Sequence, residues 1–224
     1  MSARDTVFAS IRHALGVTGA EAPRRKEVAD RLRDHPRGVI PARGQLPDGE
    51  RIALCLDKIE AVAGTTERLP TLSELPAAVA RYLRANNLPL AVKRGSDPRL
   101  AAVHWEYEPG LTVSVGPSHG DDLAAISFAY GAAAETGTLV LLSGPDNPTT
   151  LNFLPDHHIV VVEAGTIAAD YETVLARLRE ADGSAGLPRA INLVTGPSRS
   201  ADIEQTLILG AHGPRRLHVI VLEG

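Results

Sequence analysis

The run HIVVVE, residues 158–163, carries apolar side chains on both faces of an extended segment. Five further runs are strand-like: LTVSV at 111–115, AAISFA at 124–129, TLVLL at 138–142, AINLV at 190–194 and LHVIVL at 217–222. Strands that are apolar on both faces are typical of sheets covered by helices on each side. Most of these runs have that character, so they predict a buried sheet at the centre of the fold.

Segments with helical spacing alternate with these runs. The apolar residues that would form the inner faces of three helices are Ile52, Cys55, Leu56 and Ile59; Leu72, Leu75, Val79, Tyr82 and Leu83; and Ile167, Tyr171, Val174, Leu175 and Leu178. A further strand is expected at 89–93. This alternation predicts an α/β fold. Because the runs at 124–129 and 138–142 are close enough for an antiparallel hairpin, we expect a mixed sheet wrapped by helices.

The first 48 residues differ from the remainder of the chain. Residues 2–15 have the pattern of a short amphipathic helix, with Ser2 as its cap and Gly16 at its end. From residue 17 to 48, four prolines and a mixed run of charges interrupt the periodicity, which predicts a linker or a loosely packed arm. We therefore divide the chain into an N-terminal helix and flexible arm, 1–48, and an α/β domain, 49–224.

Composition narrows the possible functions. The net charge of −4 argues against a sequence-independent nucleic-acid binder. The single cysteine, Cys55, supplies neither a disulfide nor an all-cysteine cluster within one chain, and it fits a reducing, cytoplasmic compartment. No apolar run is long enough to span a bilayer, and no histidine motif predicts a metal site. We expect a cytoplasmic protein with no membrane span, no bound metal and no cofactor of its own.

Residues 195–214, TGPSRSADIEQTLILGAHGP, place polar groups between two expected strands. The candidate binding residues in this stretch are Ser198, Arg199, Ser200, Asp202, Glu204, His212 and Gly213. Open α/β sheets usually bind ligands beyond the carboxyl ends of their strands. There the serines would expose amides to an anion, and Arg199 would hold a carboxylate or phosphate. The alternative is structural: the serines cap a helix, Asp202 favours its positive end and Arg199 is solvated.

A second concentrated feature is Glu135 in the stretch GAAAETGTLVLLSG, residues 131–144. A carboxylate beside a core strand is costly unless it is paired, protonated or facing a cavity. Glu135 is therefore a candidate general base, nucleophile or binding carboxylate, with Thr136, Gly137 and Thr138 as binding neighbours. The alternative is a hairpin with Glu135 at its edge and Gly137 in the turn.

Three of these stretches together resemble the LUD-domain family and, within it, proteins of lactate utilization: AETGTLVLLSGPDNP at 134–148, HHIVVVE at 157–163 and TGPSRSADIEQTLILGAHGPRRLHVI at 195–220. The resemblance extends over roughly residues 50–224. It implies a fold similar to the sugar-phosphate isomerase and CoA-transferase superfamily. It also implies membership of a three-component system that oxidises L-lactate to pyruvate, in which the other two subunits carry iron–sulfur clusters.

The resemblance leaves the role of this chain open among three hypotheses. The first is a subunit of the lactate-oxidising system. In it, Arg199 holds a small carboxylate and Glu135 handles a proton or holds a polar group, or the subunit serves only binding or assembly. The second is a stand-alone enzyme that acts on a phosphorylated or CoA-linked metabolite. The third is a non-catalytic adaptor that docks a partner through residues 2–15.

Overall fold

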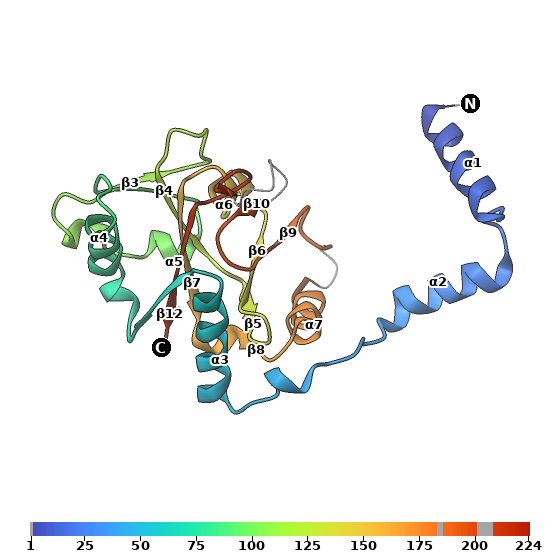
Figure 1. The fold of residues 1–224 in the computed structure, drawn as a ribbon, viewed down its shortest axis with the longest axis horizontal. Helices are drawn as coiled ribbons and strands as arrows, with labels where there is room; N and C mark the ends of the chain where they lie inside the picture. The colour runs from blue at the N-terminus through green and yellow to red at the C-terminus, as the bar shows by residue number, and fades with distance from the viewer. Residues whose placement is uncertain (1, 183–185, 201–207) are drawn as a thin grey trace. The chain divides into compact units, whose positions relative to one another are not determined.

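The computed structural model describes residues 2–182, 186–200 and 208–224 (Figure 1). It divides into two compact units, residues 1–40 and 41–224. The helices are α1 (Ala3–Leu15), α2 (Ala22–Asp34), α3 (Asp48–Ala61), α4 (Leu75–Ala85), α5 (Pro98–Ala101), α6 (Thr149–Phe153) and α7 (Tyr171–Asp182). Short 3-10 helices are η1 (Ala42–Gly44), η2 (Leu72–Glu74), η3 (Trp105–Tyr107) and η4 (Ala164–Thr166).

The strands belong to a large parallel sheet, a small sheet and a short two-stranded ladder. The strands are β1 (Thr65–Leu69), β2 (Ala91–Arg94), β3 (Thr112–Val115), β4 (Ala124–Phe128), β5 (Gly131–Ala133), β6 (Thr138–Leu142), β7 (His157–Glu163), β8 (Ile167–Ala168), β9 (Ile191–Val194), β10 (Arg199–Ser200), β11 (Ile208–Leu209) and β12 (Arg216–Leu222). The large sheet has the order β1-β12-β7-β4-β2-β3, with all its pairs parallel, and the small sheet has the order β8-β5-β6-β9.

The two faces of the large sheet each bury an apolar core. Successive side chains of a strand point to opposite faces. In β7, Ile159 and Val161 therefore join a cluster shared with α4, whereas Val160 and Val162 join another shared with α3 and the small sheet. Figure 1 shows β7 and β12 between α4 on one side and the small sheet with α7 on the other. This arrangement confirms the predicted α/β fold with a central sheet flanked by helices.

The run at 138–142 forms an antiparallel hairpin as predicted, but not with the run at 124–129. Strand β6 pairs antiparallel with the short strand β5, which the sequence did not indicate as a separate element. The run at 124–129 forms β4 instead, which lies in the other sheet beside β7. The turn at Ala129 and Tyr130 takes the chain from the large sheet to the small one. The antiparallel pairs β5–β6 and β6–β9 thus lie apart from the wholly parallel central sheet.

The N-terminal unit contains two helices. The expected first helix is α1, where Ser2 and Asp5 form a reciprocal capping box and Gly16 ends the helix with φ +64°. The segment expected to be a linker or loosely packed arm holds a second helix, α2. Ion pairs one turn apart support it, Lys26–Asp30 at 2.7 Å and Glu27–Arg31 at 2.9 Å. Its polar sequence lacks the apolar stripe by which we recognised the other helices.

Candidate functional site

Ala134 to Gly137 form the turn that joins β5 to β6, and Thr138 is the first residue of β6. The amide of Gly137 donates to the carbonyl of Ala134 at 3.3 Å, and Gly137 itself has φ +68°, where glycine is strongly favoured. A Cβ on Gly137 would stand 2.8 Å from Cβ of Lys58 and 2.9 Å from the amide nitrogen of Ile59, both in α3. The turn therefore packs against the backbone of this helix.

Four hydroxyl groups link this turn to neighbouring elements. The Oγ1 atom of Thr138 lies 2.7 Å from Thr136 Oγ1, 2.6 Å from the Tyr171 hydroxyl and 2.6 Å from Thr195 Oγ1. Thr138 is fully buried, so these bonds satisfy a hydroxyl that water does not reach. Since Thr195 begins the TGPSR stretch, the structure brings the two sequence motifs into direct contact.

Glu135 is 5% exposed and is held by groups on two other segments. Its Oε1 accepts the amide of Tyr171, at the start of α7, at 3.2 Å. Its Oε2 lies 3.9 Å from Nη2 of Arg43, in the 3-10 helix η1. A buried carboxylate needs such partners to offset the cost of losing water. These contacts tie together the ends of β5, α7 and η1, and they leave the predicted proton-handling role of Glu135 untested.

The other motif forms a second cluster around Ser198. Its amide donates to the carbonyl of Pro214 at 2.8 Å, and its Oγ accepts the amide of His212 at 3.3 Å. Gly213 packs against the same side chain. Ser198 is followed by strand β10, so it does not cap a helix as the structural alternative supposed. Ser200, which is buried, pairs with Ile208 in the ladder β10–β11.

Arg199 contacts the C-terminal end of helix α3. Its Nη2 donates to the carbonyl of Val62 at 2.7 Å. Val62 is the C-terminal cap of α3, where unpaired carbonyls attract cations. Within the described part of the chain, no ion pair joins Arg199 to Glu135. Asp202 and Glu204, together with the helix expected to follow Ser200, lie outside the described residues.

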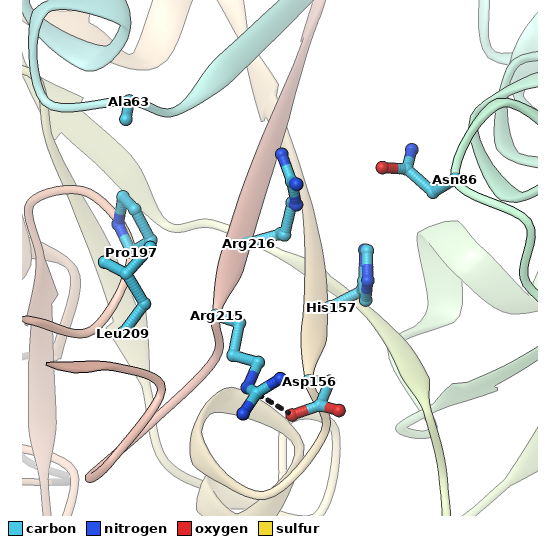
Figure 2. A pocket seen from close by; sticks show the side chains of 8 residues that line it. All are labelled: Ala63, Asn86, Asp156, His157, Pro197, Leu209, Arg215 and Arg216. Carbon is cyan, nitrogen blue, oxygen red and sulfur yellow. Dashed lines mark ion pairs between the residues drawn. The ribbon is translucent and has the colours of Figure 1, made fainter.

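A pocket of about 750 Å³ lies beside this cluster (Figure 2). Its lining residues are Ala63, Asn86, Asp156, His157, Pro197, Leu209, Arg215 and Arg216. Pro197 and Leu209 come from the segments around Ser198, whereas Glu135 and Arg199 do not line this pocket. His157 and Arg216 are the first residues of β7 and β12. The pocket is thus at the amino ends of these parallel strands, opposite to the edge that we expected.

Two arginines give this pocket its charge. Arg215 makes a 3.7 Å ion pair with Asp156, whereas Arg216 forms none with the residues that the structure describes. In Figure 2 the Arg216 guanidinium, the Asn86 amide and the His157 ring flank one space, and Arg215 points away toward Asp156. One guanidinium is therefore available to bind an anion.

His157 is oriented by a contact outside the pocket. Its Nδ1 lies 2.9 Å from the hydroxyl of Tyr82, on α4, which leaves Nε2 for other contacts. Burial lowers the pKa of His157 and the positive charge of Arg216 lowers it further, although Asp156 opposes the change. The imidazole is consequently neutral near neutral pH.

Sequence reasoning missed these pocket residues, although one signal was present. His157 and Arg216 are register partners in the parallel pair β7–β12. Each is the polar residue that opens an apolar run, HHIVVVE at 157–163 or RLHVIVL at 216–222. If the two runs had been paired as neighbouring parallel strands, their first residues would have been placed side by side.

These features define an α/β protein with a parallel central sheet, flanking helices and a basic pocket at the amino ends of two strands. Residues 121–222 match the family model described as LUD domain, so the predicted resemblance to the LUD-domain family is confirmed. Six of the eight pocket residues fall within these bounds. The match does not test the wider superfamily, which stays a prediction.

Individual relatives agree with this assignment. The chain is 36% identical over 120 residues to lactate utilization protein C of Halalkalibacterium halodurans, a match covering 53% of this chain and 51% of that protein. It is 40% identical over 100 residues to lactate utilization protein C of Bacillus licheniformis, covering 44% and 41%. The chain thus spans about half the length, or less, of these two relatives.

A solved structure shows the same fold. A DUF162 family protein from Deinococcus radiodurans superposes with a TM-score of 0.58 at 25% sequence identity. The similarity covers 79% of this chain and 99% of that one. The α/β architecture therefore extends beyond the segment that the LUD domain model matches.

Proposed function

We propose that this chain takes part in lactate utilization and that its basic pocket binds a small carboxylate. The observation that carries the proposal is the Arg216 guanidinium, which lines the pocket without an acidic partner among the described residues. Guanidinium groups bind carboxylates through two parallel hydrogen bonds. The names of the relatives supply the substrate class, because several are lactate utilization proteins.

The neighbours of Arg216 suit a hydroxy or keto acid. His157, held through Nδ1 by Tyr82, presents a neutral imidazole nitrogen, and Asn86 presents a carboxamide. Both groups donate to or accept from a hydroxyl or carbonyl oxygen. In this proposal Arg216 binds the carboxylate, and His157 and Asn86 bind the oxygen on the adjacent carbon.

Oxidation of L-lactate to pyruvate removes two electrons and two protons, so the complete reaction needs an electron acceptor. We propose that partner subunits with iron–sulfur clusters supply it, because the one cysteine of this chain cannot hold an all-cysteine cluster. Cys55 is fully buried, and burial raises the pKa of its thiol to about 12. The chain would therefore act as a binding or assembly component, with the catalytic role of Glu135 as a further hypothesis.

The direct test of binding is the melting temperature of the full chain with added L-lactate or pyruvate. Both acids should raise the melting temperature of the wild type, and Arg216→Met should abolish the rise. Arg189→Met is the matched control, since Arg189 is exposed and does not line the pocket. Equal responses of both variants to the acids would contradict the assignment of Arg216.

Purification of the native complex tests both the iron–sulfur partners and the role of Glu135. Affinity purification from an anaerobic lysate should recover iron–sulfur proteins with this chain, together with lactate oxidation. If Glu135→Gln leaves that oxidation unchanged, the residue stabilises the turn and does not handle a proton. Recovery of the chain without iron–sulfur partners would contradict the multi-subunit proposal.

The volume of the basic pocket favours one alternative. At about 750 Å³ it exceeds the space that a three-carbon acid needs and lies in the range of sites for larger metabolites. A stand-alone enzyme on a phosphorylated or CoA-linked metabolite would use the same Arg216. If acetyl-CoA or a sugar phosphate raises the melting temperature while lactate and pyruvate do not, this alternative replaces the first proposal.

A further inference from the structure

A smaller pocket of about 200 Å³ lies at the opposite ends of the strands of the large sheet. Its lining residues are Asp97, Arg99, Phe128, Tyr130, Leu142, Ser143, Gly144, Asp146 and Asn147. Phe128 is the last residue of β4, and Asp97 follows the end of β2. The pocket is therefore at the carboxyl ends of two neighbouring parallel strands, whereas the basic pocket is at the amino ends.

The topology of the chain creates a crevice at this place. Strands β2 and β4 are neighbours in the large sheet. The chain leaving β2 passes through α5 to β3, at the sheet edge, and packs in the same apolar cluster as α4. The chain leaving β4 enters the small sheet and then reaches β7, on the other side of β4. Connections that diverge in this way leave a crevice between the strand ends, where open α/β sheets bind ligands.

Two loops that border this crevice are fixed to each other. A Cβ on Gly95 would collide with the carbonyl oxygen of Asp146, so only glycine allows this approach. The Ser96 hydroxyl donates to the Pro145 carbonyl at 2.9 Å and to Asp146 Oδ1 at 3.2 Å. Asn147 Nδ2 donates to the Leu142 carbonyl at 3.2 Å. The pocket is thus bordered by a close backbone approach and by side-chain hydrogen bonds that do not need a ligand.

The charge of this pocket differs from that of the basic pocket. Its arginine, Arg99, is already occupied: Nε and Nη2 contact the two oxygens of Asp97 at 3.1 and 2.8 Å, and Nη1 lies 3.5 Å from Glu163 Oε1. The same guanidinium stacks on the Phe128 ring at 3.8 Å. Asp146 adds another carboxylate. The site therefore has a negative balance of charge and no free cation among its described lining residues.

We propose that this crevice is a second ligand site, distinct from the basic pocket, and that it takes a small uncharged or cationic molecule rich in hydrogen-bond donors. Its volume equals that of roughly six or seven liquid water molecules, which sets the ligand size. Carboxylate and carbonyl oxygens are the acceptors that such a molecule needs. A polyol or a primary amine meets these requirements, and a free carboxylate does not.

The experiment is an amide NMR titration of the full chain with ethanolamine, glycerol and L-lactate as separate probes. Ethanolamine or glycerol should shift the amides of Gly144 and Asn147, and L-lactate should leave both unchanged. Because lactate is tested at the amides of His157 and Arg216 in the same spectra, failure of the first proposal is distinguishable from failure of this one.

Two variants of the lining residues test whether the probes bind in this pocket. Asp146→Asn should weaken ethanolamine binding about two- to fivefold, as expected for one exposed charge, whereas Asp57→Asn, on the exposed side of α3, should not. Gly144→Leu adds a side chain to a lining residue where an added Cβ meets nothing within 4 Å, and it should block both probes. Shifts of Gly144 by lactate, or no shift of its amide by ethanolamine and glycerol, would overturn the proposal.

Discussion

Replacing Gly137 by alanine tests how the two sequence motifs are fixed to helix α3. The new Cβ would lie 2.8 Å from Lys58 Cβ and 2.9 Å from the Ile59 amide nitrogen, and the second is a backbone atom that cannot rotate away. Overpacking of this kind typically costs about 1–3 kcal/mol. The φ of +68° adds about 1 kcal/mol for a residue with a Cβ. We expect a loss of about 2–4 kcal/mol in the free energy of unfolding.

Urea unfolding of wild type, Gly137→Ala and Gly165→Ala would measure this loss. Gly165 is the matched control, because a Cβ there meets nothing within 4 Å and its φ is not in the left-handed region; its variant should stay within about 0.5 kcal/mol of wild type. If Gly137→Ala also stays within that margin, the turn does not pack against α3 as described.

Three other changes give separate predictions. Arg199→Gln should lower the free energy of unfolding by about 0.5–1 kcal/mol through loss of the cap on α3; no loss in urea unfolding would contradict that role. His158 is fully buried, and burial lowers its pKa from 6.5 to about 3. Between pH 3 and pH 6.5 the unfolded chain therefore carries a proton on this side chain that the folded chain does not. Stability is therefore complete above about pH 6.5 and falls by up to about 1.4 kcal/mol per pH unit below it, a slope that His158→Gln should reduce in urea titrations. Deletion of residues 1–40 should leave residues 41–224 folded, as measured by circular dichroism. If the exposed apolar face of α1, Val7 to Leu15, docks a partner, the deletion should also abolish recovery of that partner in affinity purification. Unchanged recovery would refute the adaptor hypothesis.

The buried sheet was predictable because its strands are short apolar runs with clear limits. The runs at 158–163 and 217–222 became β7 and β12, and alternation along them explains both cores. Strand β5 was not predictable, because Gly131–Ala133 carries small side chains with no alternation. The pairing of β4 and β6 with different sheets depends on long-range packing, which local periodicity does not report.

The candidate site was predictable as two motifs but not as a geometry. Thr138 and Thr195 join the two motifs, which the first hypothesis placed in one site. Arg199 nevertheless bonds to the end of α3, and the arginine available to an anion is Arg216. Both residues are arginines, so residue type alone does not separate them. What separates them is the parallel register that places Arg216 beside His157.

Calorimetric titration of L-lactate and pyruvate into wild type, Arg216→Met and Arg199→Met tests most directly that the basic pocket is the carboxylate site. Loss of a charged hydrogen-bonding partner costs about 1.5–3 kcal/mol, so we expect Arg216→Met to weaken binding roughly 10- to 150-fold. Arg199→Met should bind as wild type does, since its guanidinium caps α3. Binding that survives in Arg216→Met but is lost in Arg199→Met would contradict the assignment and return the site to the TGPSR loop.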